Sequence, residues 1–488
     1  MKKLLLFVAV MLCAAQTFSQ TTYNVSSTGT NSGTSFTTVR AAIAAAAPGD
    51  IIQLSAETFT EKQIIWNTPK SLTIKGAGMS QTVLQAYATP NNTLANNCSV
   101  FQIDGTFSAG ITITIQDLTI QNGYNLLSGG GIRLNPTVSQ ANAPVINLTN
   151  LKIANNTSVY GGGIYLAGAA ILNITGCNIT GNSMTTSGNM GGGIAVSPGS
   201  GYVATVTIKN STISGNSSAG NGGGIAINCG ANGTTPAANS LWVENSTIYG
   251  NSISTSAKMG GGIYFKACLS GQASVPTFTL TMNHCTIVNN TTVAGSTTST
   301  SGPDGVCVEN SSGYATTIVM NNSIIMGNTG STGTNTCQIG SNNTSTSSTS
   351  NGKITNGGIT NSIFGIIAGG AWATTTTNNK LDAVLTDLLF TSSLSSDATP
   401  VLKIGGTSIA KNYVTTNYLS PALTTDELGN SRDLTPDAGA YEFSDVGTLV
   451  NSPTQRNFVN TKGRVLQFVN IDGVVEIYTV NGLSLIHI

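Results

Sequence analysis

The sequence predicts an all-β solenoid, a parallel β-helix whose short strands stack from one coil to the next. The phrase Gly-Gly-Gly-Ile occurs five times, at residues 129–132, 161–164, 191–194, 222–225 and 260–263. Each copy opens a strand-like alternation, and each is followed by a second strand phrase that ends in Ile-x-x-Asn. Self-similarity at a spacing of roughly thirty residues is typical of solenoids, in which a repeat buries its apolar face only against its neighbours.

The first twenty residues predict a secretory signal peptide. Lys2 and Lys3 form a basic start, residues 4–15 an apolar run and residues 17–19 an exit of small residues. The apolar run is too short to span a bilayer as a helix, and no later segment is long and apolar enough to do so. We therefore expect an exported chain without a transmembrane segment, located outside the cell or on the outer cell surface.

The β-helix domain is predicted to cover residues 21–443, beginning with a cap over about 21–50. A short helix is expected from Ser35 to Ala47, with Ser35 as the N-cap and one apolar face. Strand runs are expected at residues 51–54, 64–66 and 72–74. A helix at this end would cover apolar surface and strand edges that a bare first coil would expose.

The GGGI repeats, at about 127–330, predict one strand face in the core and one in water. Side chains alternate across a strand. The expected inward residues are Ile132, Leu134, Ile164, Leu166, Ile194, Val196, Ile225, Ile227, Ile263 and Phe265, and the expected outward residues are Arg133, Tyr165, Ala195, Ala226 and Tyr264. A degenerate sixth copy follows at Gly305. The low-complexity stretches 291–302 and 329–352 are interpreted as protruding loops.

The second phrase predicts a left-handed corner and an asparagine ladder. The corner position is filled by residues that tolerate a positive φ: Asn150, Gly176, Asn210, Asn245, His284 and Asn322. Six residues later the phrase closes on Asn156, Asn182, Asn216, Asn251, Asn290 and Asn328. Identical amides stacked about 4.8 Å apart can pass hydrogen bonds from coil to coil.

Composition excludes several classes of function. Only 8% of the residues are charged, so the clustered Lys and Arg that nucleic-acid binding needs are lacking. Seven cysteines remain once Cys13 is removed with the signal, which leaves at least one thiol unpaired within the monomer. Cys177 and Cys285 are interpreted as buried small residues. No CxxC pair occurs and the chain has 2 histidines, so zinc has no ligand set.

With these motifs in hand, the chain resembles the right-handed parallel β-helix proteins of the pectin-lyase-like superfamily, specifically the secreted group with the choice-of-anchor Q domain. The GGGI and Ile-x-x-Asn pair is similar to the repeats of polymorphic outer membrane proteins. The resemblance is sharpest at residues 425–432 and 436–442, a closing motif within 424–443. It implies the right-handed winding. After a linker at 444–462, residues 463–488 resemble the start of a type IX secretion sorting domain and are predicted to be a truncated small β segment.

The superfamily includes polysaccharide lyases and glycoside hydrolases, so an enzyme is the alternative function. Such enzymes need calcium-binding carboxylates with a basic residue, or paired acids. Between residues 118 and 380 the acids are Glu244, Asp304 and Glu309. Asp304 and Glu309 could act together, but a solvated turn and strand end is the favoured interpretation. We predict no catalytic residue, metal site or cofactor, and calcium binding is unsupported. His284 is interpreted as structural.

Two groups of residues are the predicted sites. Arg133, Tyr165 and Tyr264 stand at outward positions, where exposed aromatic rings can support sugar rings. Asp426, Arg432, Asp437 and Glu442 are the densest charge cluster; they could hold a metal or a sugar acid, but an Arg–carboxylate network that locks the last coil is favoured.

The function that follows is a non-enzymatic, structural or adhesive β-helix that is secreted or displayed at the cell surface. Its expected partner is a polysaccharide or a cell-surface glycan. The sequence leaves open the ligand, the cysteine pairing and the oligomeric state.

Overall fold

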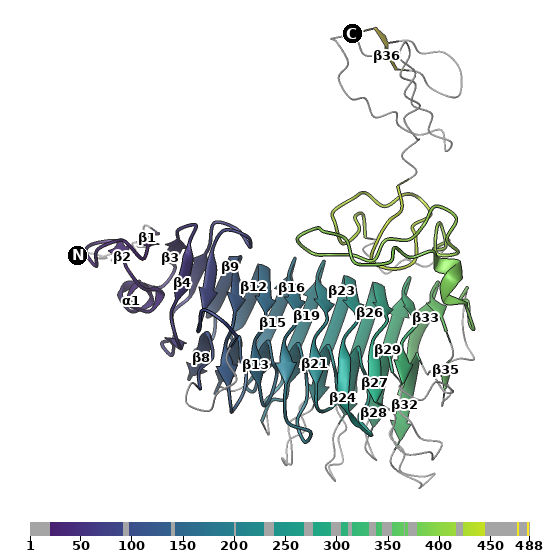
Figure 1. Cartoon of the computed structure of the whole chain (residues 1–488), viewed down its shortest axis with the longest axis horizontal. Helices are drawn as coiled ribbons and strands as arrows, with labels where there is room; N and C mark the ends of the chain where they lie inside the picture. The colour runs from purple at the N-terminus through teal and green to yellow at the C-terminus, as the bar shows by residue number, and fades with distance from the viewer. Residues whose placement is uncertain are drawn as a thin grey trace, which may run out of the picture.

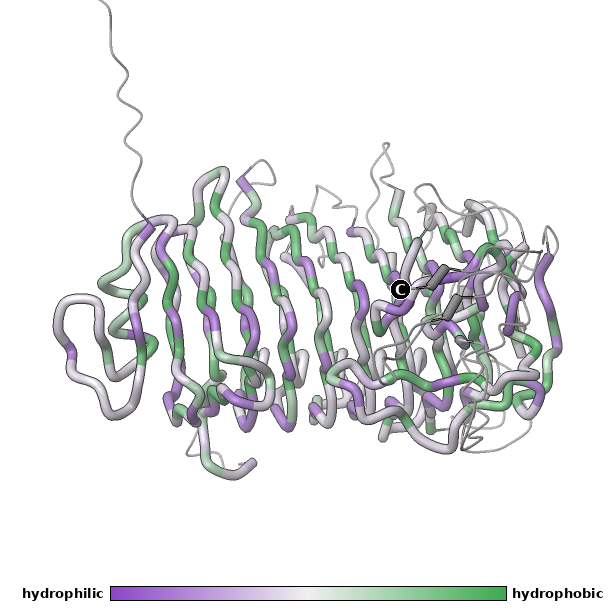
Figure 2. The backbone as a smooth tube through the Cα atoms, turned by 90° about the horizontal axis from the view of Figure 1, so that it is seen from above, coloured by the Kyte–Doolittle hydropathy of each residue, from purple (hydrophilic) through white to green (hydrophobic). Residues whose placement is uncertain are grey.

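The computed structural model describes residues 20–90, 97–137, 142–199, 202–228, 239–267, 277–293, 304–310, 315–330, 338–343, 354–365, 367–368, 378–415, 423–444, 476–477 and 486–487. These residues form a parallel β-helix, an elongated rod of stacked coils with an α-helix at its N-terminal end (Figure 1). Viewed from above, the coils follow one another as side-by-side bands along the long axis (Figure 2). The predicted all-β solenoid is therefore confirmed.

Three parallel sheets form the walls of the rod within the described residues. The seven-stranded sheet contains β10 (Tyr124–Asn125), β13 (Thr157–Ser158), β17 (Ser183–Met184), β21 (Ser217–Ser218), β24 (Ser252–Ser256), β27 (Thr291–Val293) and β31 (Thr329–Gly330). The ten-stranded sheet contains β5 (Ile64–Trp66), β8 (Phe101–Gly105), β11 (Ile132–Pro136), β14 (Ile164–Leu166), β18 (Ile194–Val196), β22 (Ile225–Asn228), β25 (Ile263–Ala267), β28 (Val306–Asn310), β32 (Ile339–Asn343) and β35 (Ile367–Ala368). Because β27 falls within residues 291–302, and β31 and β32 fall within residues 329–352, neither stretch is wholly the predicted loop.

The third wall, which we call the large sheet, has 18 strands. They are β1 (Thr22–Val25), β2 (Ser35–Phe36), β3 (Ile51–Leu54), β4 (Thr58–Thr60), β6 (Leu72–Lys75), β7 (Val83–Gln85), β9 (Thr112–Gln121), β12 (Val145–Ala154), β15 (Ala170–Thr175), β16 (Asn178–Thr180), β19 (Ala204–Lys209), β20 (Thr212–Ser214), β23 (Ser240–Tyr249), β26 (Thr277–Val288), β29 (Ala315–Asn321), β30 (Ile324–Met326), β33 (Ile354–Thr360) and β34 (Ile363–Phe364).

The capping helix exists but is shorter than predicted. Helix α1 spans Val39–Ala45, and its N-cap is Thr38, whose side chain accepts a hydrogen bond from the Ala41 amide. The predicted N-cap Ser35 instead lies in β2 and pairs with β1. Glu61 completes the helix start, because its carboxylate accepts hydrogen bonds from two further orphan amides of the first turn. The helix buries Val39, Ala42 and Ile43, as its apolar face predicts.

The glycine triplets are explained by how closely the coils approach. Gly191 has a φ of 78°, a conformation that side chains disfavour. A Cβ on Gly192 would lie 2.3 Å from the Gly223 carbonyl oxygen of the next coil, so only glycine fits. The following isoleucines then stack in register, with Ile164 paired to Ile194 and Ile194 to Ile225. Equivalent residues of successive repeats therefore stack in register, as the sequence predicts.

The corners and the ladder are confirmed. All six predicted corner residues have φ between 44° and 64°. In the ladder, the amide nitrogen Nδ2 of Asn216 donates to Asn251 Oδ1 at 2.9 Å, while its own Oδ1 accepts from Asn182 Nδ2 at 3.0 Å. Nδ2 also reaches the Ile179 carbonyl oxygen at 2.9 Å, so the interior amides are satisfied. Gln338 ends the ladder by accepting from Asn328 Nδ2 at 2.9 Å.

The expectation that the outward residues of the GGGI strands contact water is wrong for Ala195, Ala226 and Tyr264, which are buried. Part of the outer face of the large sheet is covered as well. Residues 378–415 and 423–443, which we call the C-terminal segment, fold back over its outer face (Figure 1). The segment includes one 3-10 helix, η2 (Leu385–Leu388), and packs against outward apolar side chains of the late coils. The cluster joins Val288, Ile324, Met326 and Ile363 of the sheet to Leu388, Leu402, Ile404, Ala410, Val414 and Ala438 of the segment.

Several predictions lie outside the described residues. Residues 1–19 of the predicted signal peptide (1–20), most of the predicted linker and most of the predicted sorting domain are among them. Of the tail, two strands are described, β36 (Glu476–Ile477) and β37 (Ile486–His487), which pair antiparallel. The four described cysteines, Cys98, Cys177, Cys285 and Cys307, are buried. Among the described helices, none has the length and apolar character that crossing a membrane requires.

Candidate functional site

Arg133 and Tyr165 lie side by side on the outer face of the ten-stranded sheet, but both are engaged with protein neighbours. They are register partners on β11 and β14. Arg133 forms an ion pair with Asp104 at 3.4 Å, and the Tyr165 ring lies 5.5 Å from the Tyr160 ring. Tyr165 is half-buried, and burial raises the pKa of its hydroxyl.

Tyr264 is not the exposed residue that the sequence predicts. Only 1% of it is exposed, because it packs with Ala226 and Cys307 in a small cluster outside the ten-stranded sheet. Its hydroxyl donates to Glu309 Oε2 at 2.5 Å, and burial raises its pKa. Three coil steps, or about 14 Å, separate Tyr264 from Tyr165. The structure therefore does not unite the three predicted ligand residues into one exposed surface.

The acid pair Asp304 and Glu309 serves different partners. Glu309 is ion-paired with Lys266 at 2.6 Å, whereas Asp304 accepts a hydrogen bond from Thr292 on the seven-stranded sheet. Both side chains are buried, not solvated as predicted. In the part of the chain that the structure describes, no three His, Cys, Asp or Glu residues are grouped so that they could hold a metal ion.

The four residues of the predicted closing motif converge in the C-terminal segment. Arg432 is buried and pairs with Glu442 at 3.0 Å. Its Nη2 also donates to Asn245 Oδ1 at 2.9 Å and to the Gly439 carbonyl oxygen at 3.0 Å. Asn245 is a corner residue of the large sheet, 187 positions away in sequence. The guanidinium thus joins the segment to a coil in the middle of the rod, and not to the last coil.

Backbone amides hold the carboxylates of the network. Asp426 accepts from the amides of Asn430 at 2.8 Å and of Glu442 at 3.0 Å. Asp437 accepts from the amides of Asn412 and Phe443, both at 2.6 Å. Burial raises the pKa of Asp437 to about 6 and that of Glu442 to about 7. These oxygens are already occupied by the chain itself.

Two further residues belong to this contact: Glu427, which was not among the predicted site residues, and His284, which was predicted to be structural. Glu427 accepts from Thr212 Oγ1 at 2.9 Å and from Thr247 Oγ1 at 2.6 Å, and its burial raises its pKa well above the usual value. His284 keeps the structural corner position with φ of 51°, and burial, followed by the charge of Arg432, lowers its pKa well below the usual value.

A single outward row of the large sheet shows where the segment stops. We call this row the corner row, because it consists of the residue two positions after each corner. In register along the rod its members are Thr119, Lys152, Asn178, Thr212, Thr247, Thr286 and Ile324. At its N-terminal end Thr119 donates to the Met79 carbonyl oxygen at 2.5 Å. At the other end the C-terminal segment covers the row from Thr212 onward. Between them, Lys152 and Asn178 stay open to a groove.

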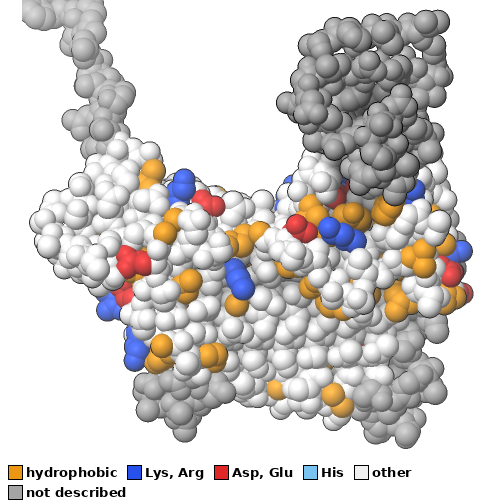
Figure 3. Space-filling view, turned by 45° about the horizontal axis from the view of Figure 1, so that its top comes forward, with side chains coloured by type: hydrophobic (Ala, Val, Ile, Leu, Met, Phe, Trp, Pro, Cys, Tyr) orange, Lys and Arg blue, Asp and Glu red, His pale blue; other side chains and the backbone are white. Residues whose placement is uncertain are grey.

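The groove has a volume of about 830 Å³ and crosses the large sheet. Met79, Ser80 and Val83 line one side, and residues 397–399 and 427–429 line the other. Three coil steps separate Thr119 from Thr212, so the open floor is about 14 Å wide. Figure 3 shows this face hollowed between the N-terminal coils and the C-terminal segment, with few charged side chains on it.

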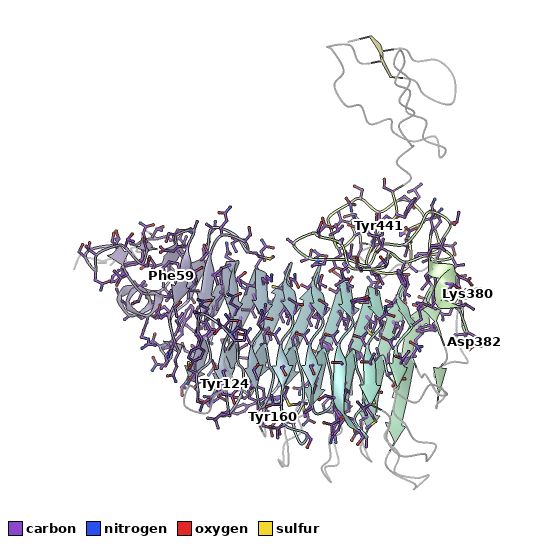
Figure 4. All side chains as sticks on the ribbon, in the orientation of Figure 1. Phe59, Tyr124, Tyr160, Lys380, Asp382 and Tyr441 are labelled. Carbon is purple, nitrogen blue, oxygen red and sulfur yellow. The ribbon has the colours of Figure 1, made fainter. Side chains whose placement is uncertain are left out.

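The floor of the groove consists of amides and hydroxyls with one cation. It is lined by Thr119, Gln121, Asn150, Lys152, Thr175, Gly176, Asn178 and Asn210. Lys152 is exposed and forms no ion pair within the described residues. Asn178 Oδ1 is covered from bulk solvent yet has no hydrogen-bond partner there. Figure 4 shows that the groove side, marked by Tyr441, lies opposite Tyr124 and Tyr160.

Comparison with known proteins adds a likeness to solved structures. No protein-family model and no curated protein matches the sequence. The chain is similar to the crystal structure of the pectate lyase Pel9A, with 16% identity and a TM-score of 0.41 over 87% of this chain and 97% of that one.

Proposed function

We propose that this protein is a non-enzymatic, exported β-helix that holds a neutral glycan in the groove on its large sheet. The observation that carries the proposal is the interrupted corner row. Thr119 and Thr212 are occupied by the protein's own atoms, whereas Lys152 and Asn178 between them face the groove. The fold therefore leaves hydrogen-bonding groups available over a limited stretch and walls that stretch on two sides.

The chemistry of the lining favours an uncharged, hydroxyl-rich ligand. Amides and hydroxyls can both donate to and accept from sugar hydroxyls. The lining carries one cation, Lys152, and two acids: Asp397, which is ion-paired with Lys403 at 3.9 Å, and Glu427, which is engaged by two threonines. The volume falls within the range of ordinary small-molecule sites. Asn178 lines the groove, and rotation of its side-chain amide toward a ligand hydroxyl would give its covered, unpaired Oδ1 a donor, which is favourable because a buried polar group without a partner is costly.

Surface display extends the proposal to the ends of the chain. The basic and apolar start of residues 1–20 supports export, and residues 463–488 support anchoring through a type IX sorting tail of the choice-of-anchor Q group. In this arrangement the rod presents the groove side outward as an adhesive module. Deletion of residues 463–488 is expected to move the protein from the cell surface into the medium, as measured by fractionation.

The binding experiment compares the wild-type chain with Lys152→Ala/Asn178→Ala by glycan array and calorimetry. We expect neutral oligosaccharides to bind the wild type and the double variant to lose at least about tenfold in affinity, from the loss of hydrogen bonds to one charged and one neutral group. Lys258→Ala, which lies outside the groove lining, and Tyr165→Ala are matched controls that should bind normally. Unchanged binding by the groove variant contradicts the proposed site.

The enzymatic alternative is tested alongside. Polysaccharides are incubated with the protein, with and without calcium, and reducing ends and unsaturated products are measured. The proposal predicts binding without turnover, and turnover that depends on Lys152 would replace it with a lyase or hydrolase function.

A further inference from the structure

The outer face of the large sheet carries one exposed tryptophan, Trp242 on β23, within the part of the chain that the structure describes. Its exposed fraction is 40%, against 0% for Trp66 in the core. Its register partners are Thr207 on one side and Thr281 on the other, so the indole stands in a row of small polar side chains. Neither partner is large enough to cover the ring.

Neighbouring charges fix the orientation of the ring without leaving a net charge. The Trp242 Nε1 hydrogen is donated to Glu244 Oε2 at 3.2 Å, and Glu244 is ion-paired with Lys209 at 2.9 Å. The Lys209 ammonium lies 5.9 Å from the centre of the indole ring. Because Glu244 is mostly buried, this arrangement holds the indole at its polar edge while leaving a substantial part of its surface in water. A preorganised ring of this kind loses little entropy on binding.

Trp242 lies beside the groove and not on a separate face. The groove-lining Thr175 pairs with Lys209, which in turn pairs with Glu244. Two coil steps, about 10 Å, therefore separate the groove floor from the residue that anchors the indole. Asn210, which also lines the groove, directly follows Lys209. The C-terminal segment contacts this strand at Asn245 and Thr247, after Trp242, so it leaves the indole exposed.

From this geometry we propose that Trp242 is a stacking subsite, which takes the apolar face of a sugar ring at the end of a glycan chain that leaves the groove toward the N-terminal half of β23. The inference rests on the proposed glycan function and deepens it. An indole presents a flat apolar surface with its one donor already occupied, which suits the C–H face of a neutral pyranose. The neighbouring Thr207 and Asn173 supply hydroxyl and amide groups for the ring substituents.

The test separates the subsite from the groove by ligand length. Neutral disaccharides, trisaccharides and longer oligosaccharides of the series bound by the wild type are titrated into the wild type, Trp242→Ala and Trp242→Phe. We expect Trp242→Ala to weaken binding of the longer chains about tenfold, the order of one aromatic stacking contact, and to leave the shortest ligands unaffected. Trp242→Phe should restore part of the loss. Ile171→Ala is the matched control, since Ile171 is exposed to 37% on the same face.

Each outcome decides something. If Trp242→Ala binds ligands of every length as tightly as the wild type does, the subsite is overturned while the groove stands. The same conclusion follows if the variant loses the same affinity for every length. If longer chains bind the wild type no better than short ones, the ligand does not reach Trp242 and the inference fails. If the wild type binds no neutral glycan of any length, the proposed function and the subsite both fall. Quenching of tryptophan fluorescence by acrylamide gives a direct readout, because long ligands should shield Trp242 and short ones should not.

Discussion

Replacing Arg432 by Ala should detach the C-terminal segment from the large sheet. The guanidinium donates to Glu442, to Asn245 and to the backbone carbonyls of Thr425, Asp437, Gly439 and Ala440, so truncation removes the shared partner of six acceptors. Breaking a buried ion pair by removing one partner costs about 3–5 kcal/mol, because the other charge is left buried. An effect of about 4 kcal/mol corresponds to about a thousandfold increase in the population of the undocked segment.

Hydrogen–deuterium exchange measures that population locally, which matters because a solenoid need not unfold as one unit. The informative amides are those that bind the segment to the sheet: Gly439 to the Asn322 carbonyl oxygen at 2.7 Å, and Ala440 to Thr286 Oγ1 at 2.9 Å. Both should exchange far faster in Arg432→Ala, while the Asn ladder keeps its protection. Arg133→Ala is the control, since its partly exposed ion pair with Asp104 should contribute less than about 1 kcal/mol. Unchanged exchange at residues 439–440 would refute the reasoning.

Three further predictions follow from the structure. Asn216→Leu removes four ladder hydrogen bonds and should destabilise the middle coils by about 4 kcal/mol, at about 1 kcal/mol for each bond. Asn173→Ala is the control, because it loses one half-exposed hydrogen bond and should change the melting temperature little. Equal melting curves for the two variants would contradict a stabilising role for the ladder. The pKa values of Asp437 and Glu442 are raised in the docked segment, so the docking free energy that these two groups contribute is fully present below their ordinary pKa values and is lost as pH rises through about 6 to 7. The lowered pKa of His284 acts in the opposite direction, because it weakens docking as pH falls below the usual histidine pKa. In His284→Asn, the docking free energy measured by exchange should therefore decrease steadily from acid to neutral pH, and Glu442→Gln should reduce this pH dependence. Tyr264→Phe should leave glycan binding intact, because the ring is buried; a large loss of affinity in calorimetry would place the ligand on the ten-stranded sheet instead.

The repeats made most of the solenoid predictable from the sequence. Glycine triplets, inward isoleucines, corner asparagines and the ladder all follow from one condition, that identical positions meet at every coil step. Each of these is a local pattern repeated with little change, so it could be aligned without knowledge of the fold. The N-cap at Thr38 was missed because Ser35 is equally suited to capping, and only its pairing with β1 excludes it.

The covering of the large sheet was harder to predict, although one signal was present. The outward position four residues after each corner changes from Ala154, Thr180 and Ser214 to Tyr249, Val288 and Met326 along the rod. A run of apolar residues on an outer face indicates that something packs there. The sequence does not identify the segment that packs there, because the contact is long-range: Thr212 and Glu427 are 215 residues apart. The groove is the gap that this long-range docking leaves, so it has no motif of its own.

Exchange protection by a bound glycan tests the central claim most directly, since it maps where the ligand lies on the rod. With the longest neutral oligosaccharide that the protein binds, we expect slower exchange at residues 119–121, 150–152, 175–178 and 427–429, which surround the groove. Protection at residues 160–166 of the ten-stranded sheet, with none in the groove, would contradict the account.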